Sequence, residues 1–147
     1  MSDLIEPVDF DRDTGYFFQA AREGRLVFRA CRSCGAGLHM PTQFCGRCGS
    51  RDTEWREAAG TGTLYSWTTV KQTVHPAYPA PYTIVQVALD EAPEVRYLGS
   101  IPGEVELCAG QPMRVVFDDR ARVSGLPQWR PAHEPPGLAG IPQLVRE

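Results

Sequence analysis

The sequence of 147 residues predicts a mainly β protein, in which a short N-terminal helix and a four-cysteine ribbon precede a five-stranded barrel. Two C-x-x-C pairs lie within residues 31–48, and runs of aromatic and β-branched residues recur at short intervals from about residue 60 to residue 131. The stretch before the ribbon has helix-boundary residues at both ends. Together these patterns favour a metal-stabilised ribbon joined to a small β domain.

The N-terminal segment, residues 1–30, begins with an acidic and loose stretch and then carries the expected helix. Asp13 or Thr14 is suited to cap its start, because a short side-chain oxygen accepts the free backbone N–H groups of a first turn. The helix runs to about Glu23, and Gly24 is suited to end it.

Three adjacent aromatic residues, Tyr16, Phe17 and Phe18, cover much of this short helix. One interpretation packs Phe17 and Ala21 inward and leaves Tyr16 or Phe18 on the surface. The other makes the helix a docking element for another protein, because clusters of exposed aromatic side chains mark interfaces.

Residues 31–56 form the predicted ribbon, in which two knuckles held by a hairpin bring four thiolates together as a tetrahedron. Gly35 and Gly49 follow the two pairs and allow the positive φ that such a turn requires. Four protein ligands leave no position open for water or substrate, so the predicted cofactor is a structural Zn²⁺. The predicted ligands are Cys31, Cys34, Cys45 and Cys48.

Other readings of the cysteines remain open. A rubredoxin-like iron site has similar spacing. Two disulfides require an oxidising compartment, and a thioredoxin-type pair requires a βαβ context that the sequence lacks. His39 lies inside the loop and is another potential ligand, although four thiolates make an exposed hairpin position the expected one.

Residues 57–131 are predicted to form an OB-type barrel, because five short strands suit a small barrel better than a sandwich of seven. The segment 103–110 is predicted to be a short helix or turn. Trp55, on the return strand, is expected to pack on the ribbon or on its junction with the barrel. The expected strands are 25–30 and 51–57 around the ribbon, then 64–74, 82–89, 95–101, 113–117 and 126–130.

The loop from residue 75 to residue 82 contains three prolines together with His75, Tyr78 and Tyr82. Prolines restrict the backbone, so this segment is either a rigid crossover or a recognition loop that presents its aromatic rings to a partner. The tail, residues 132–147, is rich in proline and cannot form a long regular element. Its apolar residues are suited to a groove of this chain or of a partner, and they are Leu138, Ile141, Leu144 and Val145.

Charge and composition exclude several classes of protein. The net charge is −3, and residues 57–131 contain six basic and eight acidic residues, whereas a nucleic-acid-binding barrel needs a basic groove. The sequence has no signal peptide and no apolar run of membrane-spanning length. Five cysteines fit a reducing compartment, so a cytoplasmic location is expected.

No catalytic set can be assembled from the sequence. Cys108 is expected to be buried, and neither His75 nor His133 has an evident partner carboxylate. Arg114, Arg120 and Arg122 are candidates for cationic contacts if a ligand carries phosphates, and a solvated surface is the alternative interpretation.

The order of these features resembles the DUF35 family. The matching stretches are Gly15–Arg25, Cys31–Cys48 with Pro41, Gly60–Trp67, His75–Pro81 and Met113–Phe117. The resemblance implies a rubredoxin-like zinc ribbon joined to an OB fold, with the four cysteines as zinc ligands.

The same resemblance implies a function. The expected role is a non-catalytic accessory subunit of a thiolase-superfamily enzyme, such as an acyl-CoA acyltransferase or a lipid-transfer-protein-like aldolase of steroid side-chain degradation. The region around Tyr16–Phe18 would be its docking surface, and an acyl-CoA contact belongs to the same expectation. Two other hypotheses are an OB-type binder of single-stranded nucleic acid and a stand-alone enzyme using His75, Cys108 or His133.

Overall fold

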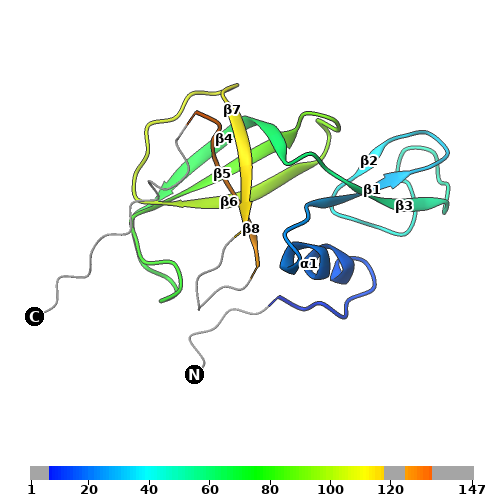
Figure 1. Ribbon diagram of the computed structural model, residues 1–147, viewed down its shortest axis with the longest axis horizontal. Coiled ribbons are helices and arrows are strands. Elements are labelled where there is room, and N and C mark those ends of the chain that lie inside the picture. Colours follow the sequence, from blue (N-terminus) through cyan, green and yellow to red (C-terminus); the bar gives the residue numbers. More distant parts are fainter. Residues whose placement is uncertain (1–6, 118–124, 134–147) are drawn as a thin grey trace, which may run out of the picture.

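The computed structural model describes residues 7–117 and 125–133. Figure 1 shows two β-sheets side by side, with a single helix beside their junction. The elements are α1 (Gly15–Arg22), β1 (Val27–Cys31), β2 (Gly37–Leu38), β3 (Thr53–Glu57), β4 (Thr61–Val70), β5 (Tyr82–Leu89), β6 (Arg96–Pro102), β7 (Pro112–Phe117) and β8 (Pro127–Pro131). The predicted fold class is confirmed: a mainly β chain with a short N-terminal helix, a four-cysteine ribbon and a five-stranded sheet. Within the described ranges, no helix has the length and apolar character needed to cross a membrane.

Helix α1 begins at Gly15, so Thr14 occupies the N-cap position, one of the two positions predicted. Asp11 Oδ1 accepts the backbone N–H groups of Asp13 and Thr14, both at 2.8 Å. These hydrogen bonds hold the pKa of Asp11 below its usual value, and the bond from Thr14 has the largest effect. The Thr14 side chain makes no hydrogen bond to the helix, so the predicted position of the cap is confirmed but the predicted side-chain bond is not found. Gly24 has a φ of 73°, which agrees with its predicted role at the C-terminal end.

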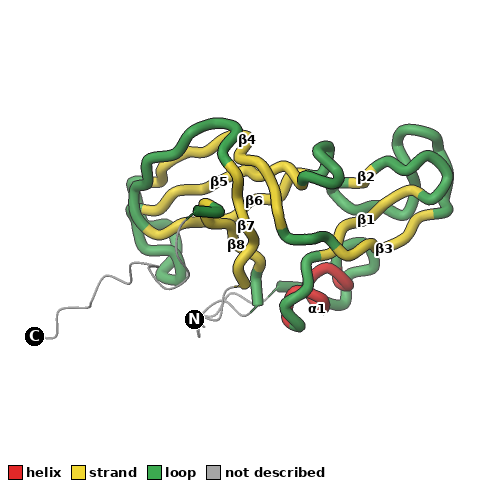
Figure 2. The backbone as a smooth tube through the Cα atoms, turned by 45° about the horizontal axis from the view of Figure 1, so that its top comes forward, coloured by secondary structure: helices red, strands yellow, loops and turns green. Residues whose placement is uncertain are grey.

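The smaller sheet has the order β2-β1-β3, and both pairings are antiparallel. Strand β1 is central, and it leads directly from the turn after α1 into the first cysteine pair. Figure 2 shows the two cysteine loops projecting from this sheet at the end of the molecule away from the larger sheet.

The larger sheet has the order β6-β5-β4-β7-β8, with every neighbouring pair antiparallel, so the two edge strands β6 and β8 run in the same direction. Side chains of β8 join these edges. Gln128 Oε1 accepts the Ser100 N–H at 2.5 Å, and Arg130 Nη1 donates to the Ser100 carbonyl at 2.9 Å. The sheet therefore curls back on itself, with its edges held by side-chain hydrogen bonds.

Two segments of this region differ from the expectation. Strand β4 runs from residue 61 to residue 70 instead of 64–74, with a bulge between Leu64 and Ser66. The segment 103–110 contains a turn at its end but no helix, so the helical alternative is wrong. In this segment Val105 and Leu107 pack against the core while the residues between them face solvent, which is an extended and not a helical pattern.

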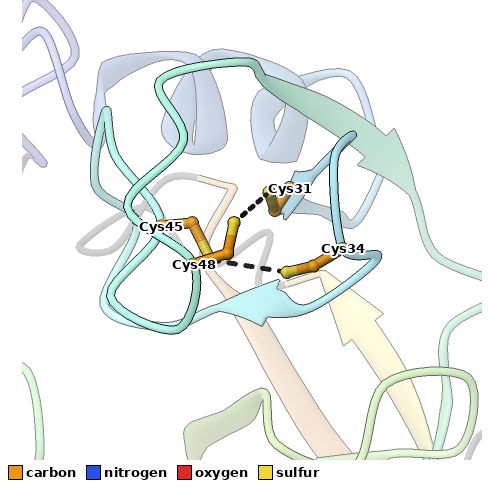
Figure 3. Close-up of side chains that lie close together, drawn as sticks. All are labelled: Cys31, Cys34, Cys45 and Cys48. Atoms are coloured by element: carbon orange, nitrogen blue, oxygen red, sulfur yellow. Dashed lines mark hydrogen bonds between the residues drawn. The ribbon is translucent and has the colours of Figure 1, made fainter.

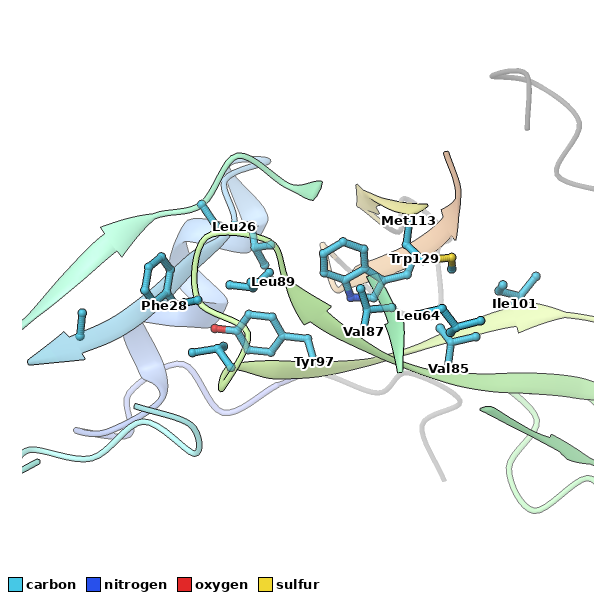
Figure 4. Packing of buried hydrophobic residues seen from close by; sticks show 14 residues of the cluster. Leu26, Phe28, Leu64, Val85, Val87, Leu89, Tyr97, Ile101, Met113 and Trp129 are labelled. Atoms are coloured by element: carbon cyan, nitrogen blue, oxygen red, sulfur yellow. The ribbon is translucent and has the colours of Figure 1, made fainter. Parts of the chain in front are cut away.

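One apolar core spans both parts of the molecule. Strand β5 alternates strictly between half-buried and buried residues, as expected for a strand that covers a core with one face. Figure 4 shows side chains of the ribbon stem and of the larger sheet in the same cluster. Its labelled members are Leu26, Phe28, Leu64, Val85, Val87, Leu89, Tyr97, Ile101, Met113 and Trp129. Because the stem shares this core, the ribbon is fixed in orientation relative to the barrel.

The approach of β6 to β8 depends on the absence of a side chain at Gly99. A Cβ built there lies 2.9 Å from Trp129 Cδ1 and 3.0 Å from the Trp129 backbone nitrogen. Trp129 is fully buried, so neither atom has room to move away.

We expect Gly99→Ala to destabilise the protein by roughly 1–3 kcal/mol through overpacking, measured by urea unfolding of the zinc-loaded protein. Gly46→Ala is the matched control, because nothing lies within 4 Å of a Cβ at Gly46 and its φ is not positive. Equal stability of the two variants would contradict the close approach of β6 to β8.

Candidate functional site

The two cysteine knuckles have the same backbone geometry. The carbonyl of Cys31 accepts the N–H of Gly35 at 2.9 Å, and the carbonyl of Cys45 accepts the N–H of Gly49 at 2.8 Å. Both glycines have a φ of 75°, in the left-handed region that favours glycine. Each knuckle is therefore a tight turn that aims two sulfur atoms in one direction.

The four sulfur atoms meet at one point, as Figure 3 shows. Cys31 Sγ lies 3.6 Å from Cys48 Sγ, and Cys34 Sγ lies 3.6 Å from Cys45 Sγ; all four lie within 4.8 Å of one another. A tetrahedral site with metal–sulfur bonds of about 2.3 Å separates its sulfurs by about 3.8 Å. A disulfide joins them at about 2.05 Å. The spacing fits a metal tetrahedron, and all five cysteines are free thiols, which rules out the disulfide alternative.

The knuckles favour the ionised form of Cys31 and Cys45, whereas burial and the neighbouring thiols raise the pKa of Cys48 to about 11. Hydrogen bonds from the backbone N–H of Cys48, and then of Arg47, lower the pKa of Cys45. Burial opposes ionisation of Cys31, but hydrogen bonds from the Cys34 backbone, the Cys48 thiol and the Ser33 backbone outweigh it and bring the pKa of Cys31 to about 7. Thiolates are the form that binds a soft metal, so metal binding would displace the proton that Cys48 otherwise retains.

His39 does not belong to the sulfur cluster. Among the described residues, the group whose ligand atoms converge consists of the four cysteines alone. The imidazole of His39 instead meets the ring of Tyr97 edge-on, with centroids 5.0 Å apart, and burial lowers the pKa of His39. The candidate metal centre therefore has four sulfur donors, which is the set preferred by zinc or iron.

The aromatic residues of α1 take different positions. Tyr16 is 41% exposed and packs on Trp55, with ring centroids 5.5 Å apart. Phe17 packs on Tyr97 at 5.2 Å, and Phe18 packs edge-on against Phe17 at 5.2 Å. Helix α1 therefore bridges the small sheet through Tyr16 and the larger sheet through Phe17.

The proline-rich loop folds back on itself. The Tyr78 N–H donates to the His75 carbonyl at 2.9 Å, and His75 Nδ1 accepts the Ala77 N–H at 3.1 Å. The rings of Tyr78 and Tyr82 lie 5.9 Å apart. His75 thus has a structural hydrogen bond within its own loop, and the two tyrosines are held together.

The helix, the ribbon loop and the proline-rich loop surround one cavity of about 410 Å³. Strands β6 and β8 contribute to its wall. The sequence singled out Phe17, Phe18, Tyr78 and Tyr82, and all four line it. The sequence did not connect the other lining residues with this cavity, because they come from segments far apart in the chain. They include His39, Met40, Pro41, Ile84, Tyr97, Leu98, Leu126 and Gln128.

The remaining predicted site residues are not brought together with this cavity. Arg114 lies on β7, is half-buried and does not line the cavity, while Arg120 and Arg122 lie outside the described residues. Cys108 is exposed, so the expectation that it is buried is wrong; it follows Leu107, which packs inward in the extended segment. The tail residues Leu138 to Val145 also lie outside the described part of the chain.

A four-sulfur ribbon fixed to a curled five-stranded sheet defines the class of a zinc ribbon joined to an OB fold. Residues 18–54 match the family model described as "ChsH2, rubredoxin-like zinc ribbon domain", and residues 55–118 match "ChsH2, C-terminal OB-fold domain". A solved structure described as "Ltp2-ChsH2(DUF35) aldolase" is similar with 33% identity and a TM-score of 0.74, over 86% of this chain and 99% of that chain. The chain belongs to the DUF35 family.

Two further relatives extend the comparison. A DUF35 protein of unknown function from Sulfolobus solfataricus shares the fold, with 16% identity and a TM-score of 0.56 over 74% of this chain and 82% of that chain. A protein of Thermomonospora curvata named "Probable enoyl-CoA hydratase alpha subunit" is 35% identical over 124 residues, or 83% of this chain. The chain spans 38% of that curated relative.

The metal centre is tested by comparing serine substitutions at two exposed cysteines, one inside the cluster and one outside it. Cys34→Ser removes a predicted ligand, whereas Cys108→Ser removes an exposed thiol outside the cluster and is the matched control. We expect one zinc per chain in the unmodified protein and in Cys108→Ser, and less than half of that in Cys34→Ser. Mass spectrometry of the metals in purified protein measures zinc and iron together. Equal metal content in both variants would contradict the assigned ligands, and iron at one equivalent would replace zinc as the metal.

Proposed function

We propose that this chain is a non-catalytic accessory subunit that docks on an enzyme of the thiolase superfamily, with a lipid-transfer-protein-like aldolase as the specific partner. The observation that carries this proposal is the 33% identity over nearly the whole length of the chain described as "Ltp2-ChsH2(DUF35) aldolase". Steroid side-chain degradation is the setting we propose, in the cytoplasm, where thiolates remain reduced.

The zinc is proposed to be structural. Four thiolates fill a tetrahedron, so a bound ion has no open position at which to activate water or polarise a substrate. Cys31 and Cys45 are fully buried, while Cys34 and Cys48 lie towards solvent. The four ligands would hold the ion as a cross-link between the two knuckles.

Absence of catalysis by this chain is supported by the residues that sequence reasoning considered. His75 Nδ1 accepts a hydrogen bond from its own loop, and Cys108 and His133 lie on the surface. General-base and nucleophilic catalysis need two such groups within hydrogen-bond reach of each other. Among the described residues, no hydrogen bond joins any of these three side chains to another side chain.

The proposed docking surface comprises α1 and the segment before it. Tyr16 is 41% exposed on the helix, and Phe10, which the sequence did not single out, is 87% exposed just upstream. Val8 is also exposed in the same segment. A monomer gains nothing from exposing such rings, whereas an interface that buries them gains the free energy of their transfer from water.

An acyl-CoA substrate of the partner is supported by the second relative, whose name includes an enoyl-CoA hydratase subunit. Because this chain spans 38% of that relative, the hydratase activity belongs to the longer protein. We propose that this chain contacts the thioester only within the assembled enzyme. Of the three arginines predicted to contact phosphate, Arg114 is the one that the structure describes.

The proposal is tested by co-expression with each thiolase-like or lipid-transfer-like protein encoded beside this chain. We expect a stable complex with one of them, weakened at least tenfold in Kd by Tyr16→Ala, since an anchoring aromatic residue is worth more than about 1.4 kcal/mol. Tyr65→Ala is the matched control, because Tyr65 is 53% exposed on β4 and lies outside α1.

The same preparations separate an accessory role from catalysis. The isolated zinc-loaded chain should leave acyl-CoA unchanged, and the complex should be active. A chain that elutes alone beside every such candidate, or that turns over acyl-CoA by itself, would refute the accessory role.

A further inference from the structure

The cavity between α1, the ribbon loop and the larger sheet has the features of a ligand site. Its volume of about 410 Å³ falls within the range of about 300–1,000 Å³ typical of small-molecule sites. Leu98 and Met40, which line it, are 64% and 66% exposed, so the cavity opens to solvent at their side. Six rings contribute to its wall: Phe17, Phe18, His39, Tyr78, Tyr82 and Tyr97.

The wall carries no formal charge. Among the described residues that line the cavity there is no aspartate, glutamate, lysine or arginine. His39 is the one titratable cation-forming group in this set, and burial lowers its pKa, which favours the neutral ring at pH 7. Moving an ionised group from water into such a site without a partner charge is strongly unfavourable. The cavity therefore selects against phosphates and carboxylates.

The walls are held in place before a ligand arrives. The Tyr97 hydroxyl donates to the Val27 carbonyl at 2.8 Å, and the Tyr97 ring is packed between Phe17 at 5.2 Å and His39 at 5.0 Å. One buried residue thus connects the helix, the ribbon and the larger sheet around the cavity. A preformed wall loses little side-chain entropy on binding, which favours affinity.

The Gln128 side chain adds an amide to the polar groups of the lining residues, which also include the hydroxyl-bearing Thr14, Tyr78, Tyr82 and Ser100. Gln128 lines the cavity and is 4% exposed. Its Oε1 faces the Ser100 N–H, which can only donate, so the orientation of the amide is determined. The NH₂ group at the other side of the amide is a donor, for which a carbonyl or hydroxyl oxygen of a ligand is a suitable acceptor.

We propose that this cavity binds an uncharged apolar small molecule, or the uncharged apolar end of a larger one, with a ring or branched chain against the aromatic walls. An oxygen acceptor on the ligand fits the Gln128 amide. The described lining residues all belong to this chain, so the proposed ligand site goes beyond the accessory role and does not require a docked partner enzyme.

The test uses the purified, zinc-loaded full chain and the uncharged fluorescent probe N-phenyl-1-naphthylamine. We expect saturable binding of one probe per chain. Leu98→Asp places a carboxylate at the mouth of the cavity without burying it, because Leu98 is largely exposed, and it should weaken probe binding at least tenfold. Val74→Asp is the matched control, because the substitution adds the same charge. Val74 is 84% exposed and does not line the cavity.

Each outcome decides the inference. Loss of binding in Leu98→Asp but not in Val74→Asp, with unchanged thermal midpoints, supports it. No saturable binding, or equal binding by both variants, overturns it. Displacement of the probe by coenzyme A alone would show that the cavity takes a charged ligand, which also overturns it. If the unmodified chain binds no probe but Leu98→Asp abolishes complex formation with the partner enzyme, the cavity is a protein docking groove, and the accessory role survives without the ligand site.

Discussion

The structure depends first on four sulfur atoms that converge within 4.8 Å of one another. The ribbon has a separate apolar cluster of only four residues, two of which are cysteines: Cys31, Ala36, Leu38 and Cys45. So small a cluster cannot offset the conformational entropy of its two loops, and short segments of this kind are normally stabilised by a metal. The hairpin that joins the knuckles carries His39, Met40 and Pro41, so the metal centre also determines where one wall of the cavity lies.

The junction between the ribbon and the larger sheet is the second constraint. Glu94 Oε1 accepts the Gly37 N–H at 2.7 Å, and Glu91 Oε1 accepts the Ala59 N–H at 2.9 Å. Both glutamates lie in the turn between β5 and β6. A Cβ at Gly37 would lie 2.6 Å from Val95 Cγ2, so a residue without a side chain allows this contact. Together with the shared core, these bonds make one body of two modules.

Local patterns predicted the elements well, and long-range contacts account for what was missed. Strand β5 was predicted at its observed bounds, because its alternation and its flanking turns are both local signals. The position of the helix cap was predictable, but its hydrogen bonds were not, because the Thr14 hydroxyl donates to Asp11 and not to the helix. The cysteine cluster was predictable because knuckle geometry is encoded within a few residues. The cavity was not, since its walls meet only after the helix, the ribbon and two sheet edges have packed, and Tyr97 has no local feature that marks it as their meeting point.

The bonds from the ribbon to the turn between β5 and β6 have a consequence for recognition. A partner that touches both the ribbon and the barrel meets two patches at a fixed separation, without a flexible linker between them. Binding at the first patch then brings the second to an effective concentration set by geometry alone. Two weak contacts on such a rigid frame can act together as a bivalent ligand does. Neither patch then needs enough affinity to bind a partner by itself.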